Sequence, residues 1–133
     1  MSMNTVVKLA RRPQGHVQRE DFTITQEPLA ELKDGEIKEF EVSPADFGLP
    51  SSSDSITGGD AAENAGVARR ILSGEETGVK RDVVLANAGT ALYLAGKTAT
   101  IQDGVNMARE SIGSGAALKK LDALREFTQN LTA

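Results

Sequence analysis

The chain has 133 residues, a formal net charge of −4 and no cysteine. This length is enough for one domain with a core, and an apolar share of 39% is typical of globular proteins. The missing cysteines exclude disulfides, thiolate catalysis and cysteine-based zinc sites. The acidic balance argues against a nucleic-acid or anionic-membrane binder, because such proteins need a dense basic face. We therefore expect a cytoplasmic protein with no nucleic-acid partner.

No segment predicts a membrane anchor or a signal peptide. The N-terminal stretch MSMNTVVKLARRPQG lacks an apolar core of signal-peptide length. The most apolar later run, 83–95, is shorter than the ~20 residues that a membrane span needs. We therefore expect no membrane association.

Strand and turn signals fill residues 1 to about 49. The runs 5–9 (TVVKL) and 21–27 (DFTITQE) have the β-branched or alternating pattern of strands. The segment LAELKDGEIKEFEV predicts a hairpin, because Asp34 and Gly35 tolerate the positive φ angles of a tight turn. Pro44 then ends the second strand, since it has no N–H to donate.

Helix signals fill the rest of the chain. Asp60 and Glu63 form a capping pattern at the start of the first helix. The second helix is apolar nearly all round and should be central, and its Gly89 fits there if another backbone packs closely. The predicted helices cover about 61–72, 80–95, 100–112 and 116–131. The fold class is therefore α+β: a short β-rich N-terminal part with a hairpin, then a cluster of four helices.

The stretch SITGGDAAENAGVARR offers two interpretations. Gly58 and Gly59 precede a helix, and exposed N–H groups at such a helix start can bind phosphate. Asp60 occupies the N-cap position, however, and already supplies an anion to those donors. The Lys-Ser/Thr pair of a P-loop and the GxGxxG fingerprint are both missing. Helix capping is the favoured interpretation, and phosphate binding is the alternative.

The remaining chemically active side chains do not form a site. His16 is the only histidine and lies in a polar loop without a spaced partner. The acidic pairs at 20–21 and 75–76 lack a third ligand nearby, which favours solvated charge over metal binding. Tyr93 has the spacing of a core residue. We therefore assign no catalytic, cofactor-binding or metal-binding residue.

Three segments resemble the C-terminal portion of the anthranilate phosphoribosyltransferase family, over about residues 30–131. They are LKDGEIKEFEVSPADFGLP, GGDAAENAGVARRILSGEETGVKRDVVLANAGTALYLAGK and GVNMARESIGSGAALKKLDAL. The resemblance implies part of the α/β domain of an enzyme that transfers ribose 5-phosphate from phosphoribosyl pyrophosphate to anthranilate. It also implies tryptophan biosynthesis and the use of magnesium by the complete enzyme.

The family's catalytic motifs do not map onto this chain. Residues 57–60 (TGGD) imitate the family's diphosphate-binding GTGGD loop in letters, but the following AAENA matches a later helix start. The family's KHGN stretch and its metal-binding Asp-Glu pair have no equivalent here. The resemblance therefore implies a chain that is inactive alone and has no cofactor of its own.

The first part of the chain resembles a different family. RRPQGHVQREDFTITQEPLAELKDGEI, within about residues 5–37, is similar to the opening of zinc-independent medium-chain NADPH-dependent oxidoreductases. No strand–GxGxxG–helix unit follows. We therefore predict two segments, 1–36 and 37–133, with a junction near Asp34 and Gly35. A natural fusion, a truncation and a designed chimera are all open interpretations.

The favoured function is a fragment or fusion related to anthranilate phosphoribosyltransferase. The alternatives are a non-catalytic structural or interaction protein and a remnant of an NADPH-dependent reductase. Because helices cut from a larger domain leave apolar surface bare, we expect a homo-oligomer or a complementing chain as partner.

Overall fold

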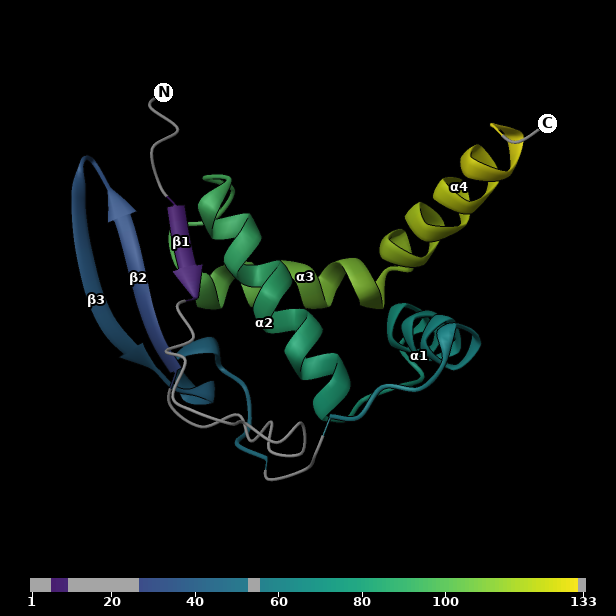
Figure 1. The fold of residues 1–133 in the computed structure, drawn as a ribbon, viewed down its shortest axis with the longest axis horizontal. Helices are drawn as coiled ribbons and strands as arrows, with labels where there is room; N and C mark the ends of the chain where they lie inside the picture. Colours follow the sequence, from purple (N-terminus) through teal and green to yellow (C-terminus); the bar gives the residue numbers. More distant parts are fainter. Residues whose placement is uncertain (1–5, 10–26, 53–55, 132–133) are drawn as a thin grey trace.

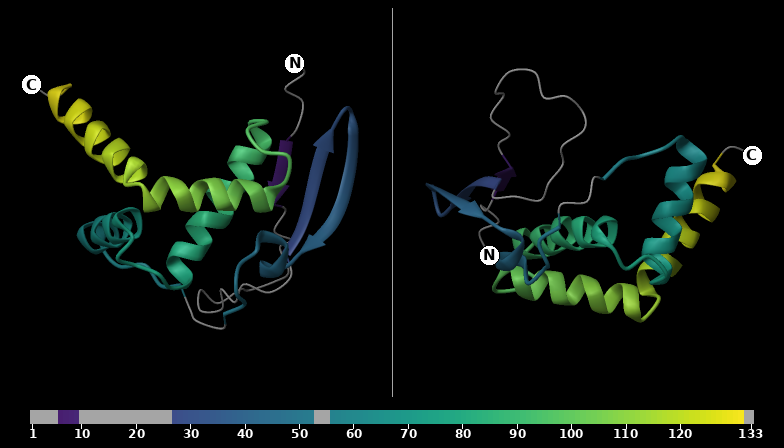
Figure 2. Two further views of the ribbon diagram at one scale, coloured as in Figure 1. Left: turned by 180° about the vertical axis from the view of Figure 1, so that it is seen from behind. Right: turned by 90° about the horizontal axis from the view of Figure 1, so that it is seen from below.

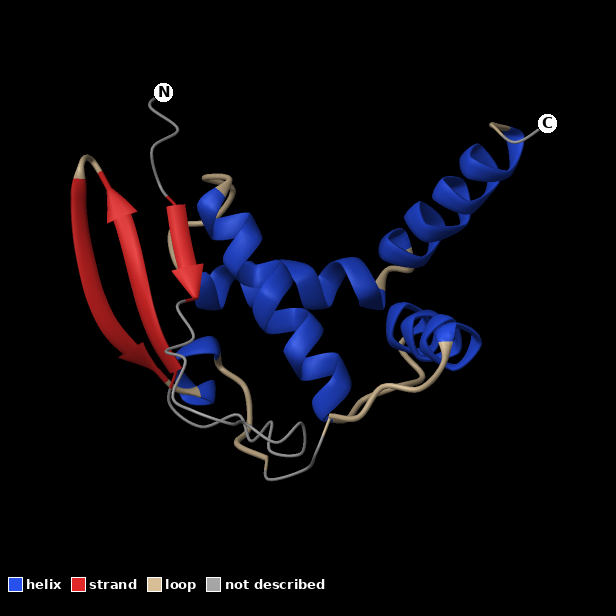
Figure 3. Cartoon of the chain, in the orientation of Figure 1, coloured by secondary structure: helices blue, strands red, loops and turns tan. Residues whose placement is uncertain are grey.

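The computed structural model of the protein describes residues 6–9, 27–52 and 56–131. The strands gather at one end of the molecule, helices α2 and α3 cross in the middle, and α1 and α4 lie at the other end (Figures 1 and 3). The described part is therefore a small sheet followed by helices, which confirms the predicted fold class.

The described strands form one antiparallel sheet in the order β1-β2-β3. They are β1 (Val6–Leu9), β2 (Glu27–Lys33) and β3 (Glu36–Val42). Asp34 and Gly35 join β2 to β3 with φ angles of 52° and 84°, which suit a hairpin whose turn residues both have positive φ. The predicted hairpin and the predicted first strand are confirmed. The predicted strand at 21–27 lies outside the described residues, except that Glu27 begins β2.

Helices form at the four predicted places. The described helical elements are a 3₁₀ turn, η1 (Pro44–Phe47), and the helices α1 (Ala61–Ser73), α2 (Val79–Leu94), α3 (Ile101–Gly113) and α4 (Ala116–Asn130). Local signals fix their ends. Thr100 caps α3 by accepting the Asp103 N–H at 3.0 Å, and Gly74 ends α1 with a φ of 84°.

The core lies where α2 crosses α3. Leu85 and Val105 are completely buried there. A Cβ placed on Gly89 would lie 2.6 Å from the backbone nitrogen of Val105, and one placed on Gly104 would overlap the carbonyl oxygen of Gly89. The two helices therefore cross backbone against backbone. This confirms the close packing predicted at Gly89, and the structure identifies Gly104 as its partner.

Helices α1 and α4 form the periphery at the end away from the sheet (Figures 1 and 2). An ion pair at 2.8 Å joins Arg69 on α1 to Asp122 on α4. Helix α4 has no buried residue, and Leu124 and Phe127 on its distal half are 57% and 63% exposed. Packing therefore covers only the first turns of α4.

A hydrogen bond between side chains connects the described part of the sheet to α2. The Tyr93 hydroxyl near the end of α2 donates to Oε1 of Glu31 on β2 at 2.6 Å. Leu29, two residues earlier on β2, is buried against the helices at 2% exposure. The face of β2 that carries Leu29 and Glu31 is thus the face that the helices cover.

Candidate functional site

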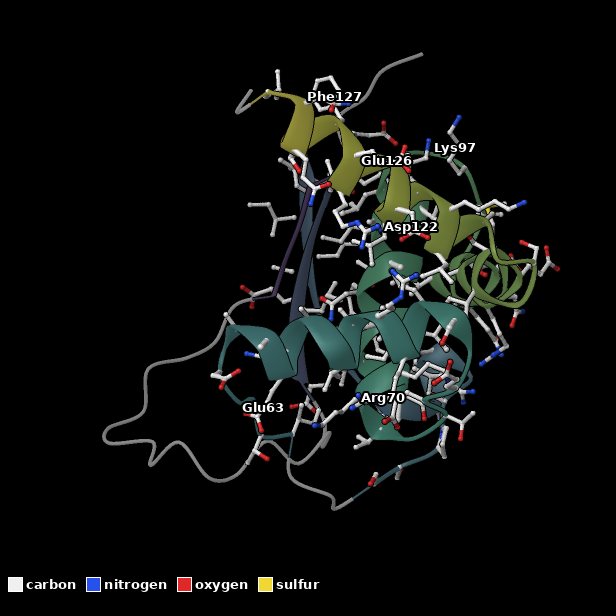
Figure 4. The ribbon with its side chains drawn as sticks, turned by 90° about the vertical axis from the view of Figure 1, so that its right-hand side faces the viewer. Glu63, Arg70, Lys97, Asp122, Glu126 and Phe127 are labelled. Carbon is white, nitrogen blue, oxygen red and sulfur yellow. The ribbon has the colours of Figure 1, made fainter. Side chains whose placement is uncertain are left out.

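The glycine-rich loop before α1 borders a cavity of about 640 Å³. Its lining combines the loop with one side of α1 and the start of α2: Thr57, Gly58, Gly59, Ala62, Glu63, Asn64, Gly66, Val67, Arg70 and Lys80. Glu63 and Arg70 both lie on the side of α1 that faces away from α4 (Figure 4). Two cationic side chains, Arg70 and Lys80, therefore share this cavity with the loop.

Side chains of α1 already bind the polar groups of this loop. Asn64 accepts the Gly59 N–H at 3.0 Å and donates to the Gly59 carbonyl at 2.8 Å. Glu63 accepts the Asp60 N–H at 3.0 Å, while Asp60 accepts the Glu63 N–H at 2.9 Å. This reciprocal pair is a capping box, so the favoured interpretation of the stretch is confirmed.

An anion bound to the N–H groups of Gly59 or Asp60 would first have to displace those side chains. Both N–H groups already donate, to Asn64 and to Glu63. The carboxylate of Glu63 at the same point would also repel an anion. Arg70 and Lys80 make the cavity locally attractive to negative charge, but the loop is built as a helix start.

A second cavity, of about 380 Å³, separates the hairpin from the helices. Tyr93 and Glu31 line it, and donation to the Glu31 carboxylate raises the pKa of the Tyr93 phenol above its usual value, with burial adding to the effect. Asp46 lines it from η1, and the Ser43 backbone N–H at 2.7 Å lowers the pKa of that carboxyl. Its polar groups therefore serve to hold elements together.

Sequence reasoning missed Asp82, the one buried charged residue in the described ranges. It is 6% exposed in the first turn of α2 and accepts from the Arg81 guanidinium at 3.2 Å. A carboxylate near a helix N-terminus is favoured by the helix dipole. Its position in the first turn of the predicted helix is the sequence signal that could have identified it. There the carboxylate stabilises the start of α2.

The other residues that the sequence singled out are a histidine and two acidic pairs. His16 and the pair at 20–21 lie outside the described residues. Glu76 of the second acidic pair closes the turn between α1 and α2, because its side chain accepts the Gly78 N–H at 3.1 Å. Within the part of the chain that the structure describes, no three acidic or histidine side chains gather as metal ligands. The described residues therefore offer no set of ligands for the magnesium that the family resemblance implies.

A short antiparallel hairpin leads into helices that pack on one face of the sheet, an α+β arrangement that can form one part of a larger domain (Figure 3). Comparison with known families agrees: the model of the glycosyl transferase family, a/b domain, matches residues 14–118. The chain belongs to this family.

The similar proteins are anthranilate phosphoribosyltransferases, matched over part of their length. The chain is 45% identical over 114 residues to the one from Rubrobacter xylanophilus, covering 84% of this chain and 33% of that protein. It is 38% identical over 129 residues to the one from Methanobrevibacter smithii, an alignment that covers 96% of this chain and 38% of that protein. The crystal structure of the Thermus thermophilus enzyme superposes with a TM-score of 0.70 at 32% identity, over 90% of this chain and 34% of that chain. The chain therefore spans about a third of the length of these relatives.

The match does not stop at the expected junction. The family match begins at residue 14, and the Methanobrevibacter smithii alignment covers 96% of the chain. Both run through Asp34 and Gly35, so the comparisons do not support an oxidoreductase-like origin for residues 14–36. In the structure, the hydrogen-bonded ladder between β2 and β3 joins residues on both sides of the predicted division at residue 36.

Within residues 6–9, 27–52 and 56–131, no helix combines the length and the apolar character needed to cross a bilayer.

Proposed function

We propose that the chain supplies one part of the α/β domain of an anthranilate phosphoribosyltransferase of tryptophan biosynthesis, acts in the cytoplasm, and is inactive without a complementing chain. The observation that carries this proposal is the partial span: the chain covers 33% of a relative to which it is 45% identical. The donors of its glycine loop are engaged by Asn64 and Glu63, which agrees with a structural role for that loop.

The physical reason for the proposed inactivity is a lack of groups that bind the diphosphate of the phosphoribosyl donor. Transfer from phosphoribosyl pyrophosphate develops charge on a diphosphate leaving group, which must be held by positioned donors or cations. In the described part of the chain, Arg70 and Lys80 line a cavity together with the glycine loop, and the N–H groups of Gly59 and Asp60 are engaged by side chains. Catalysis therefore needs groups from elsewhere.

The test is an assay of anthranilate consumption with phosphoribosyl pyrophosphate and magnesium, followed by the fluorescence of anthranilate. The chain is assayed alone and after co-expression with the part of the Rubrobacter xylanophilus relative that lies outside the matched third. We expect no turnover above buffer from the chain alone, and turnover from the pair. The relative's part expressed alone is the control. Turnover by the chain alone would contradict the proposed inactivity.

One observation favours a second candidate, a non-catalytic interaction protein that associates with itself. The distal half of α4 exposes Leu124 and Phe127 at 57% and 63%, and the C-cap residue Leu131 is 67% exposed. Exposed apolar side chains at helical spacing are a common basis of helix pairing. Under this candidate the chain self-associates and the co-expressed pair shows no turnover.

A further inference from the structure

The sequence contains two Asp-Gly pairs, and the structure places them in contrasting surroundings. One pair, Asp34 and Gly35, forms the two-residue turn between β2 and β3. The other pair, Asp103 and Gly104, lies in the first turn of α3. Both aspartates are exposed, so access to water does not distinguish the two pairs. The surroundings of the two glycines do.

An Asp-Gly pair can isomerise, because glycine has no Cβ that would hinder reaction at its own nitrogen. The glycine nitrogen bonds to Cγ of the aspartic acid, and the amide proton and the carboxyl hydroxyl leave as water. Water then reopens the five-membered imide. When it breaks the bond between the nitrogen and the original main-chain carbonyl carbon, the product is isoaspartate, whose main chain runs through Cβ and Cγ. One water is released and one is taken up, so no co-reactant is needed.

The reacting atoms of the first pair are unobstructed. The last pair of the β2–β3 ladder is Lys33 with Glu36, so Gly35 lies outside the ladder. Within the described residues, its N–H bonds to no other backbone group, and a Cβ placed on it would meet nothing within 4 Å. The turn lies at the free end of the hairpin, opposite the end that leads into η1 (Figure 1). Ring closure at Asp34 therefore requires only a local change of an exposed turn.

The reacting atoms of the second pair are held in place. The Gly104 N–H donates to the Thr100 carbonyl at 3.2 Å, and the Thr100 hydroxyl donates to the Asp103 carboxylate at 2.7 Å. Gly104 is buried, and a Cβ placed on it would overlap the carbonyl oxygen of Gly89. Ring closure at Asp103 would have to open the start of α3 and move Gly104 away from the crossing with α2.

We propose that Asp34 is a site of spontaneous isomerisation to isoaspartate and that the fold protects Asp103 from the same reaction. The modification needs neither a substrate nor a complementing chain. Isoaspartate adds one atom to the main chain of the two-residue turn. Because loop length fixes the turn type and the register of a hairpin, the product no longer fits the turn between Lys33 and Glu36, and the ladder loosens from this end.

The test incubates the whole 133-residue chain in near-neutral buffer, once folded and once in guanidinium chloride. After the denaturant is removed, each sample is digested with an endoproteinase that cleaves before aspartate but not before isoaspartate. Mass spectrometry gives the uncleaved fraction at each site. In the folded chain, this fraction should grow at least about tenfold faster at Asp34 than at Asp103, because reaction at Asp103 needs α3 to open. In guanidinium chloride, we expect similar rates at both sites.

Gly35→Asn is the matched variant, because asparagine tolerates a positive φ but adds a Cβ beside the reacting nitrogen. It should lower the rate at Asp34 and leave the rate at Asp103 unchanged, and circular dichroism verifies that the incubated chains are folded. Equal rates at both sites in the folded wild type would overturn the proposal. So would an unreactive Asp34 in a folded chain whose denatured form reacts. A faster reaction at Asp34 in guanidinium chloride as well would also overturn it, since adjacent sequence rather than the fold would then select the site.

Discussion

At the scale of single residues, the contact between Gly89 and Gly104 sets how closely the two central helices approach. Each position lacks room for a Cβ, and the obstructing atoms belong to backbone or to the buried Val105. Backbone atoms cannot rotate away as a flexible side chain can. Of the described core, the crossing should therefore tolerate an added side-chain atom least.

Gly104→Ala is expected to lower the free energy of unfolding by about 3 kcal/mol, the range of overpacking in a close-packed core. Gly113→Ala in the same helix is the control, because a Cβ there meets nothing within 4 Å and the φ angle is not left-handed. The control should be neutral or stabilising by up to about 1 kcal/mol, since alanine favours helix. Urea denaturation measures both. Equal effects of the two substitutions would contradict the backbone contact.

Tyr93 makes the stability of the fold depend on pH in the alkaline range. Its pKa is raised chiefly by donation to Glu31, so folding favours the protonated phenol. That contribution is complete below the ordinary tyrosine pKa of about 10 and is lost as pH rises through the higher folded value. The chain has one tyrosine and no tryptophan, so the tyrosinate absorbance reports this group alone.

We expect the absorbance midpoint of the folded chain to lie above that of the chain in denaturant. Glu31→Gln removes the carboxylate acceptor and should bring the midpoint of the folded chain back toward the ordinary value. In Tyr93→Phe, the fall in stability over this alkaline range should be smaller than in the wild type. Coincident midpoints for folded and denatured wild type would contradict the hydrogen bond.

At the scale of elements, the ends of the helices follow from local sequence. The capping box at Asp60 and Glu63 and the hairpin turn at Asp34 and Gly35 each use contacts between residues close in the chain. Such contacts depend little on the rest of the molecule. Sequence periodicity and capping patterns therefore suffice to predict these elements without any tertiary contact.

Asp60→Ala should lower the free energy of unfolding by about 1 kcal/mol, because the Glu63 N–H loses its acceptor. Asp60→Asn is the matched control, since asparagine caps almost as well and should cost only a few tenths of this amount. Urea denaturation compares them. An unchanged free energy of unfolding in Asp60→Ala would contradict the capping role. Tight binding of inorganic phosphate by Asp60→Ala would support the phosphate-binding interpretation of this loop.

The faces of the elements were less predictable than their ends. Apolar side chains recur at helical spacing along α4, yet Leu124 and Phe127 in its distal part are exposed. Periodicity shows that a helix has an apolar face but not what lies against it. Gly104 was missed for the same reason, because a close approach needs a partner from a distant part of the sequence.

At the scale of the whole molecule, exposed apolar surface should make the isolated chain associate. Phe127 projects from the end of α4 away from α1 (Figure 4), at 63% exposure. We expect sedimentation velocity to show an average mass that rises with concentration. Phe127→Gln should reduce this association, because it removes apolar area from the exposed stripe.

Glu126→Gln, at the neighbouring exposed position, is the control and should associate as the wild type does. A chain that stays monomeric at every concentration would contradict the expected self-association.

The sequence by itself determined the first strand, the hairpin, the helix starts and the family, because these depend on neighbouring residues and on motifs carried by contiguous segments. Tertiary structure decided the crossing of Gly89 against Gly104 and the bond between Tyr93 and Glu31. Each of these joins residues from separate elements. Their geometry exists only once the helices have packed, since no local spacing specifies which faces meet.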